Sequence, residues 1–312
     1  MIKYTIGLPV IKSKFLAITL ESILNQTYKG FKVIIKNNAL NFDEKKQISE
    51  ICKVYTKLSN FEYFESEKKL DISLNFNSIL DKVTTDFFMI LSDDDSLNPD
   101  FIKNIDKLTL KYNNINLFHC RVEIIDEYGK ISSITPICPE FETEFDFIYS
   151  RLIGIRHQFL SDFVVRTDLL KNVGGFQILN SGWGLDDITW LKLSSPGVAY
   201  TNYFGLKYRT SNSNFTSQIH NFNERVMDIL LICNLAKSRL YENKFIIKRS
   251  NYIIENAIEK FRNRSIEYLL IKKYLYVGFF KLIWDYFLDH KKLKITFSNL
   301  VKAILKSKKI KL

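Results

Sequence analysis

Residues 86–95 read DFFMILSDDD, and this stretch decides the fold. Residues 86–92 form a nearly continuous apolar run, as expected of a central strand that is buried on both faces of a parallel sheet. Asp93, Asp94 and Asp95 follow this run directly. In open α/β sheets, ligands bind beyond the carboxyl ends of the strands, where connecting loops provide polar groups. The sequence therefore predicts an α/β fold with an acidic ligand site at one edge of its sheet.

Three adjacent carboxylates repel one another, so they favour a bound cation. Mg²⁺ and Mn²⁺ prefer oxygen ligands and commonly take one or two carboxylates together with water and substrate phosphate. A calcium-binding EF-hand loop is excluded, because its required positions are occupied by Leu97, Asn98 and Asn104. The alternative is a solvated acidic turn whose carboxylates cap the next helix.

The sequence on either side alternates between apolar runs and helical spacing, with only 11 Gly and 5 Pro in 312 residues. This pattern is typical of an α/β chain with a mostly parallel sheet and flanking helices. The expected strands are residues 4–10, 31–36, 61–64, 86–92, 116–126 and 163–165, and the expected helices include 44–58, 74–83 and 99–112. Residues 129–160 show no clear periodicity and are expected to form a substrate-facing loop region.

A second acidic motif, GWGLDD, occupies residues 182–187. Sugars present apolar C–H faces to aromatic rings and hydroxyls to carboxylates, so Trp183 is a candidate for acceptor binding. Asp186 and Asp187 are the candidates for a general base. The same carboxylates would also suit the first turn of a helix, and both interpretations can hold at once.

Two further candidates lie outside these motifs. Lys207, Tyr208, Arg209 and residues 211–217 are expected to form a polar loop that closes over phosphates, with Arg209 as the phosphate partner. His157, in the irregular region, is a candidate contact for the acceptor.

Charge is distributed unevenly along the chain, whose formal net charge is +11. Residues 237–312 contain 19 Lys+Arg and 6 Asp+Glu, which leaves the first 236 residues near neutral. Such a basic tail favours an anionic surface, unless it is simply a solvated face. Lysines there alternate with apolar residues that suit an interfacial helix, namely Tyr274, Tyr276, Phe279, Phe280, Ile283, Trp284 and Phe287.

The location of the protein can also be predicted. The four cysteines are far apart and match no zinc pattern, so they are expected to be free thiols in a reducing compartment. The N-terminus lacks the features of a signal peptide, and residues 274–288 are too short and too charged to span a bilayer. We expect a cytoplasmic protein that is peripheral on the inner face of the cytoplasmic membrane.

Several motifs occur together in an order that resembles a known family: the chain is similar to inverting glycosyltransferases of family 2, which have the GT-A fold. The matching segments are TIGLPV at 5–10, ESILNQTY at 21–28, FKVIIKNNA at 31–39, SDDD at 92–95 with Pro99-Asp100 after it, VGGF at 173–176, and GWGLDD. The resemblance implies a Rossmann-like catalytic domain over residues 1–221. A basic, amphipathic helical region is expected over 222–312.

The resemblance also implies roles for individual residues at the donor site. Pro9 and Asn37 would line the nucleotide pocket, and Asp93 would contact ribose. Asp94 and Asp95 would hold Mn²⁺ or Mg²⁺. The sequence departs from the family pattern at Asn37, which replaces the more common aspartate, so the base of the donor stays open.

Two other roles are implied less directly. Asp186 or Asp187 would be the general base, depending on how the motif is aligned with the family. His220 would be a further metal ligand, as a histidine near the end of this domain is in some GT-A enzymes, unless it is simply a surface residue.

Taken together, these features predict an inverting, metal-dependent enzyme of the hexosyltransferase type. It would move a sugar from a nucleotide-diphosphate sugar, with a UDP-sugar expected, to a hydroxyl of a glycan or lipid-linked glycan. Bacterial surface polysaccharide synthesis (capsule, lipopolysaccharide or lipooligosaccharide) is the expected setting. The alternatives are a basic nucleic-acid-binding protein and a non-catalytic scaffold that binds nucleotide sugars. Nucleic acid is not expected as a partner, because the basic residues are mostly lysines and no nucleic-acid motif occurs.

Overall fold

The computed structural model describes residues 2–179, 181–211, 221–242 and 251–310. The chain divides into two compact units. The first comprises Met1–Phe147, Ile155–Ile178 and Leu185–Thr210, and the second comprises Ile148–Gly154, Leu179–Gly184 and Ser211–Leu312. Two short segments from the first two-thirds of the chain thus group with the C-terminal helices.

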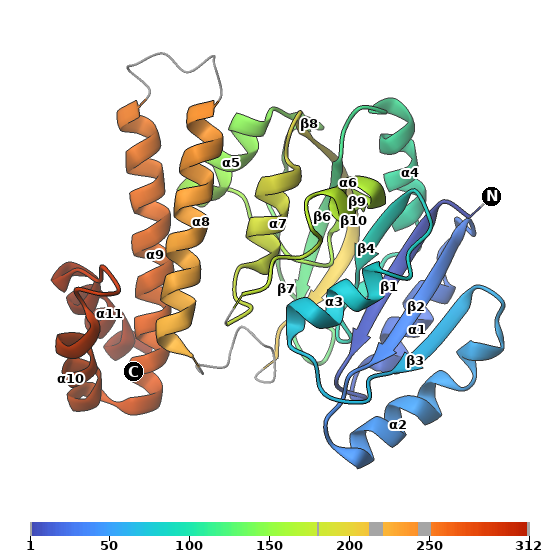
Figure 1. Ribbon diagram of the computed structural model, residues 1–312, viewed down its shortest axis with the longest axis horizontal. Helices are drawn as coiled ribbons and strands as arrows, with labels where there is room; N and C mark the ends of the chain where they lie inside the picture. The colour runs from blue at the N-terminus through green and yellow to red at the C-terminus, as the bar shows by residue number, and fades with distance from the viewer. Residues whose placement is uncertain (1, 180, 212–220, 243–250, 311–312) are drawn as a thin grey trace. The chain divides into compact units, whose positions relative to one another are not determined.

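The first unit is built on a mixed sheet with the strand order β3-β2-β1-β4-β9-β6-β10-β5 (Figure 1). Parallel pairing joins β1 to β2 and β4, β2 to β3, and β6 to β10, whereas β9 and β5 pair with their neighbours in antiparallel fashion. The strands are β1 (Tyr4–Val10), β2 (Phe31–Asn37), β3 (Phe61–Glu65), β4 (Phe87–Ile90), β5 (Ser96–Leu97), β6 (Leu117–Ile125), β7 (Ile131–Ile134), β8 (Phe141–Glu142), β9 (Phe163–Arg166) and β10 (Val198–Arg209). The predicted α/β class is confirmed.

Helices flank this sheet because its strands present apolar side chains on both faces, successive residues pointing to opposite sides. In β1, Tyr4, Ile6 and Leu8 belong to one buried cluster, whereas Gly7 lies on the opposite face, close to Ile79 and Phe88. The helices of this unit are α1 (Leu16–Leu24), α2 (Phe42–Cys52), the 3₁₀ helix η1 (Tyr55–Lys57), α3 (Ile72–Leu80), α4 (Phe101–Lys111), α6 (Thr167–Asn172) and α7 (Leu185–Leu193). Helix α5 (Glu144–Ile153) begins in this unit, and its residues from Ile148 onward belong to the second unit.

Strand β4 is buried along its whole length, as its apolar sequence predicts. Phe87 and Met89 point into the cluster formed with α1, α2 and α4, and Phe88 packs near Phe176 on the other face. Burying a side chain of this size contributes roughly 1.5–3 kcal/mol. The strand that carries the acidic residues is therefore a rigid mount.

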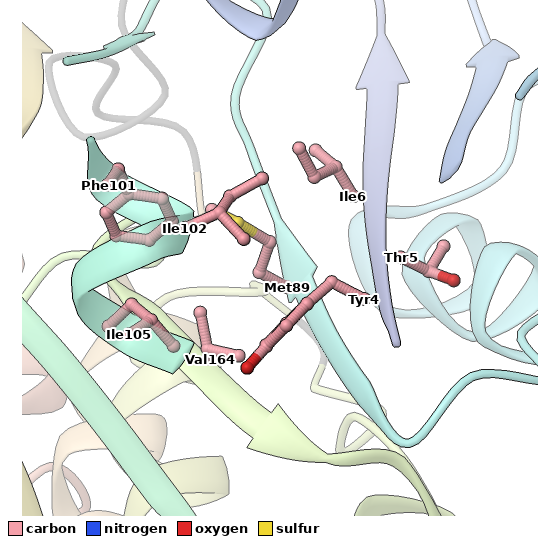
Figure 2. A pocket seen from close by; sticks show the side chains of 8 residues that line it. All are labelled: Tyr4, Thr5, Ile6, Met89, Phe101, Ile102, Ile105 and Val164. Atoms are coloured by element: carbon pink, nitrogen blue, oxygen red, sulfur yellow. The ribbon is translucent and has the colours of Figure 1, made fainter. Parts of the chain in front are cut away.

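A small gap in the core lies between β1, β4 and α4 (Figure 2). Its lining is mostly apolar and consists of Tyr4, Thr5, Ile6, Met89, Phe101, Ile102, Ile105 and Val164. Because a sugar or nucleotide site needs converging polar groups, this gap is a packing feature of the core.

The loop expected at 129–160 is wrong, and so is the part of the polar loop that was expected at Lys207, Tyr208 and Arg209. Residues 212–217 of that polar loop lie outside the described residues. The region 129–160 contains β7, β8 and α5, and Lys207, Tyr208 and Arg209 end the long strand β10. Strands β7 and β8 are too short to show a clear period, and β8 pairs with Val198 and Ala199, which are distant in sequence. Such pairing cannot be read from local periodicity.

The second unit is mainly helical over its described residues beyond 221, as predicted. It contains α8 (Phe222–Glu242), α9 (Asn251–Val277), α10 (Phe279–Asp289) and α11 (Phe297–Ile310). Among the helices that the structure describes, none combines the length and hydropathy needed to cross a membrane.

Candidate active site

The acidic residues lie at the carboxyl edge of the parallel strands. Strands β1 and β2 end side by side, with Val10 opposite Asn37 in the register. Strand β4 runs parallel to β1, so the turn that follows it emerges at the same edge (Figure 1). The topology therefore places Asp93, Asp94 and Asp95 beyond the carboxyl ends of the parallel strands.

Asp93 ties this acidic turn to the end of β1. Its Oδ2 atom accepts hydrogen bonds from the backbone N–H groups of Ile11 at 2.8 Å and Lys12 at 2.9 Å. On the other side, the hydroxyl of Thr19 in α1 donates to the carbonyl of Asp95 at 2.7 Å. The turn is thus held by contacts with two neighbouring elements, and it does not cap α4, whose N-cap residue is Asp100.

Asp95 is only 1% exposed, and both of its carboxylate oxygens accept hydrogen bonds. Oδ1 accepts from the backbone N–H of Arg209 at 2.9 Å, and Oδ2 accepts from the hydroxyl of Ser161 at 2.7 Å. Hydrogen bonds to an ionised carboxylate stabilise its charged form. Asp95 is therefore fixed in orientation by two segments that are far from it in sequence.

The side chain of Arg209 braces the same turn from the end of β10. Its guanidinium donates to the carbonyls of Asp94 at 2.9 Å, Asp126 at 3.2 Å and Glu127 at 3.3 Å. It also lies 4.4 Å from the centre of the Phe15 ring. Arg209 thus brings positive charge to the acidic turn from a buried strand position.

Burial raises the pKa of all three carboxyl groups, and the charge of Asp94 raises the pKa of Asp93 and Asp95 further. Burial, followed by the charge of Asp94, raises the pKa of Asp93 to about 7. Burial raises the pKa of Asp94, and burial with the charge of Asp94 raises the pKa of Asp95 well above its ordinary value. A cation in contact with this cluster would favour the ionised forms, so the donor chemistry suits a hard divalent metal.

The described residues do not by themselves form a complete metal cage. Within residues 2–179, 181–211, 221–242 and 251–310, no group of three or more His, Cys, Asp or Glu side chains is arranged to hold a metal ion. His220, the further ligand predicted from the sequence, lies outside the described residues. A metal held here by one or two carboxylates would complete its shell with water and phosphate.

The predicted nucleotide-pocket residues lie at the ends of the first two strands. Pro9 is buried in β1, opposite Lys36. Asn37 ends β2 and is also buried, and its amide nitrogen donates to the carbonyl of Lys45 and the hydroxyl of Tyr63, both at 2.9 Å. The Asn37 amide group therefore links the end of β2 to Lys45 in α2 and to Tyr63 in β3.

The second acidic pair opens helix α7. Asp186 and Asp187 occupy its first turn, as predicted from the GWGLDD motif. Asp187 is buried and its Oδ1 accepts a hydrogen bond from the amide of Gln158 at 3.3 Å, whereas Asp186 is half-buried. Trp183 belongs to the second unit and is half-buried, and its backbone N–H donates to the hydroxyl of Ser181 at 3.1 Å.

The segment 158–162, before β9, contacts both groups of carboxylates. Gln158 binds Asp187, and Ser161 binds Asp95. Asp162 is buried beside them, and burial raises the pKa of its carboxyl group well above the ordinary value. The two acidic motifs, which are about ninety residues apart in sequence, are thus linked through one short segment.

Sequence reasoning missed Ser161 and Asp162, because no motif marks them. Their only signal is a polar pair directly before the apolar strand β9. His157, the predicted acceptor contact, is exposed at the start of this segment. Next to it, Arg156 is buried, forms an ion pair with Glu142 and lies 3.2 Å from a ring nitrogen of His119.

Comparison with known proteins shows which family the chain resembles. A family model described as glycosyl transferase family 2 matches residues 6–173. No significant match was found among curated protein sequences.

Solved structures share the fold at low sequence identity. S. aureus TarS 1-349 in complex with UDP-GlcNAc matches with a TM-score of 0.63 and 14% identity, over 98% of this chain and 80% of that one. The complex of the same protein with UDP matches with a TM-score of 0.56 and 16% identity, over 88% and 87%. The mannosyltransferase PcManGT from Pyrobaculum calidifontis, in complex with GDP-Man and Mn²⁺, matches with a TM-score of 0.57 and 14% identity, over 98% and 86%. These likenesses confirm the predicted GT-A-like fold.

Proposed function

The chain belongs to glycosyl transferase family 2 and is a nucleotide-sugar glycosyltransferase, and from this premise we propose that it is an inverting, metal-dependent enzyme of the hexosyltransferase type. The observation that carries the proposal is the pair of carboxylate groups that contact the same segment, through Gln158 and Ser161. A direct displacement needs one acidic site to hold a cation against the leaving diphosphate. It needs a second acidic site to take the proton of the attacking hydroxyl. The chain supplies both on rigid elements.

We assign the first group to the donor. Asp93 would contact the ribose, and Asp94 and Asp95 would hold Mn²⁺ or Mg²⁺, with His220 as a further proposed ligand. When bound, the cation would neutralise negative charge that develops on the departing nucleoside diphosphate. Pro9 and Asn37 would shape the nucleotide pocket, and Arg209 would add positive charge beside the phosphates.

We assign the second group to the acceptor, with Asp187 as the general base. The acceptor hydroxyl attacks the anomeric carbon and loses its proton to the carboxylate, while the bond from that carbon to the diphosphate oxygen breaks. Gln158 holds Asp187 in one orientation, which favours proton transfer to a fixed point. Asp186 and His157 would contact the acceptor sugar. Trp183, which belongs to the second unit, stays an acceptor contact predicted from the sequence.

We propose the donor and the acceptor by chemical class. We propose a UDP-sugar as the donor, and the likeness to the TarS complexes with UDP-GlcNAc and UDP supports this choice, although the PcManGT complex contains GDP-Man. We propose a glycan or lipid-linked glycan as the acceptor, in bacterial surface polysaccharide synthesis.

A donor panel tests this function. The full-length protein is incubated with UDP- and GDP-sugars, with Mn²⁺, Mg²⁺ or EDTA, and with or without a cell-envelope glycan extract, and release of nucleoside diphosphate is measured. We expect release that requires one donor, a divalent cation and the extract. Full activity in EDTA would contradict the metal proposal, and no release with any donor would contradict the proposed donor class.

A further inference from the structure

Helix α10 carries apolar residues on two opposite faces. Leu282 and Tyr286 are buried against the rest of the C-terminal unit. The opposite face is formed by Phe280, Trp284, Phe287 and Leu288, whose spacings of four, three and one place them on one side of the helix. They are strongly exposed: Phe280 87%, Trp284 64%, Phe287 65% and Leu288 66%.

A second exposed stripe begins beside the first. On α11, Phe297, Val301 and Leu305 follow at spacings of four residues and are 65%, 37% and 58% exposed. The ring of Phe297 lies 6.5 Å from the ring of Tyr286 in α10, so the start of α11 packs next to the end of α10. The exposed residues of both helices, Phe280, Trp284, Phe287, Leu288, Phe297, Val301 and Leu305, are called the aromatic ridge below. Exposed apolar surface of this kind marks an interaction site.

Lysines surround the aromatic ridge. Residues 279–307 contain six lysines and two aspartates, an excess of four positive charges. All six lysines are exposed, namely Lys281, Lys291, Lys292, Lys294, Lys302 and Lys306. Lys302 and Lys306 form ion pairs with Glu267 of α9. Of the two aspartates, Asp285 is already bound at 2.9 Å by both Lys273 and Lys281.

The densest positive charge lies between the two helices. Lys291, Lys292 and Lys294 connect α10 to α11, and no carboxylate in the described part of the chain lies within ion-pair distance of them. Their charge is therefore available to an anionic partner at the ridge itself.

We propose that the aromatic ridge docks on an anionic lipid bilayer, with its apolar side chains in the headgroup region and Lys291, Lys292 and Lys294 on lipid phosphates. Bulky aromatic side chains flanked by lysines suit an interfacial helix, and each Lys near an anionic surface adds up to about a fivefold gain in binding. A second copy of this chain fits less well, because a symmetric contact would bring two lysine-rich surfaces together. This inference goes beyond the proposed transferase function and does not depend on turnover.

The structure also narrows the surface suggested by composition. Tyr274 is buried in α9, so it belongs to the core of the unit. The docking surface is instead restricted to the outward faces of α10 and α11.

Vesicle co-sedimentation of the full-length protein tests the proposal without any donor. The probes are vesicles of phosphatidylcholine alone and of phosphatidylcholine with phosphatidylglycerol. We expect binding to the anionic vesicles, a loss of about tenfold or more for the triple variant Phe280→Ser, Trp284→Ser, Phe287→Ser, and a loss of about 10- to 100-fold for Lys291→Gln, Lys292→Gln, Lys294→Gln. High salt should weaken binding of the unchanged protein.

A matched control removes an exposed aromatic side chain elsewhere. Phe42→Ser, at the start of α2, changes a residue that is 78% exposed and should leave vesicle binding unchanged. Circular dichroism checks that each variant is folded. Equal vesicle binding by the ridge variants and the control would overturn the proposal. So would a different pair of results: the unchanged protein forms a dimer in sedimentation velocity and does not bind the vesicles, whereas the aromatic triple variant is a monomer. If the unchanged protein binds the anionic vesicles but releases no nucleoside diphosphate in the donor panel, only the proposed function is contradicted.

Discussion

The amide of Gln158 donates to Asp187 at 3.3 Å, and three residues later the hydroxyl of Ser161 donates to Asp95 at 2.7 Å. The proposed base and the proposed metal ligand are thus oriented by the same segment. A change in residues 158–162 would therefore affect the orientation of both Asp187 and Asp95.

Replacing Asp187 by asparagine should separate catalysis from donor binding. The amide cannot accept the acceptor's proton, so kcat should fall by about 10²- to 10⁴-fold while the dissociation constant of the donor stays nearly unchanged. Single-turnover kinetics and donor titration measure the two effects. Asp186→Asn is the matched control, and equal losses in both variants would refute the assignment of the base to Asp187.

Ser161→Ala should weaken cation binding without removing a ligand. A hydrogen bond to a charged group contributes about 1.5–3 kcal/mol, so losing it should raise the pKa of Asp95 and reduce Mn²⁺ affinity by about tenfold or more. Calorimetric titration of Mn²⁺ in the presence of UDP measures this. Ser132→Ala is the control, because the Ser132 hydroxyl, on the exposed strand β7, donates to the backbone carbonyl of Ile124 in β6. Unchanged Mn²⁺ affinity in Ser161→Ala would argue against a role for Asp95 in the metal site.

The metal-free protein should become less stable as Asp93 ionises. Because burial raises the pKa of Asp93 to about 7, the native state binds this proton more tightly than the unfolded chain does. The stabilisation is fully present below the ordinary pKa of an aspartate and is lost as pH rises through about 7. Relative to the unchanged protein, Asp93→Asn should therefore gain thermal stability between about pH 4 and pH 7, by a few degrees in Tm.

Calorimetric scans in EDTA across this range measure the difference between the two proteins. Saturating Mn²⁺ should reduce it, because a bound cation favours the ionised carboxylate. A difference in Tm that does not change with pH would show that Asp93 titrates normally.

The VGGF motif should tolerate a change at one glycine far better than at the other. Gly174 and Gly175 both have positive φ, at 85° and 71°, but a Cβ atom on Gly174 would meet nothing within 4 Å. A Cβ atom on Gly175 would collide with the side-chain oxygen of Asn77, which accepts a hydrogen bond from the backbone of Phe176. Gly174→Ala should cost about 1–2 kcal/mol of backbone strain, and Gly175→Ala at least about 1 kcal/mol more.

Urea unfolding of the two glycine variants measures these free energies. Equal destabilisation would mean that Asn77 moves aside at little cost, so the second glycine would be needed only for its φ angle.

The order of local patterns determined the fold class and the edge of the sheet at which the site lies. The apolar run before Asp93 is local, and a parallel strand buried on both faces must deliver its next residues to the carboxyl edge. The start of α7, with Asp186 and Asp187 in its first turn, was likewise visible, because acidic residues are enriched in the first turn of a helix. The lack of periodicity in residues 129–160 led to the wrong expectation of a loop region, because β8 exists only through its pairing with β10.

What the sequence alone determined was the family, the helical tail and the set of candidate carboxylates, since each depends on residues close together in the chain. Only the tertiary structure decided how those carboxylates are held. Arg209 reaches Asp95 across 114 positions and Ser161 reaches it across 66, and no periodicity encodes such contacts. It also decided which apolar residues of the tail face solvent, because an amphipathic pattern gives the faces of a helix but not which of them the neighbouring helices cover.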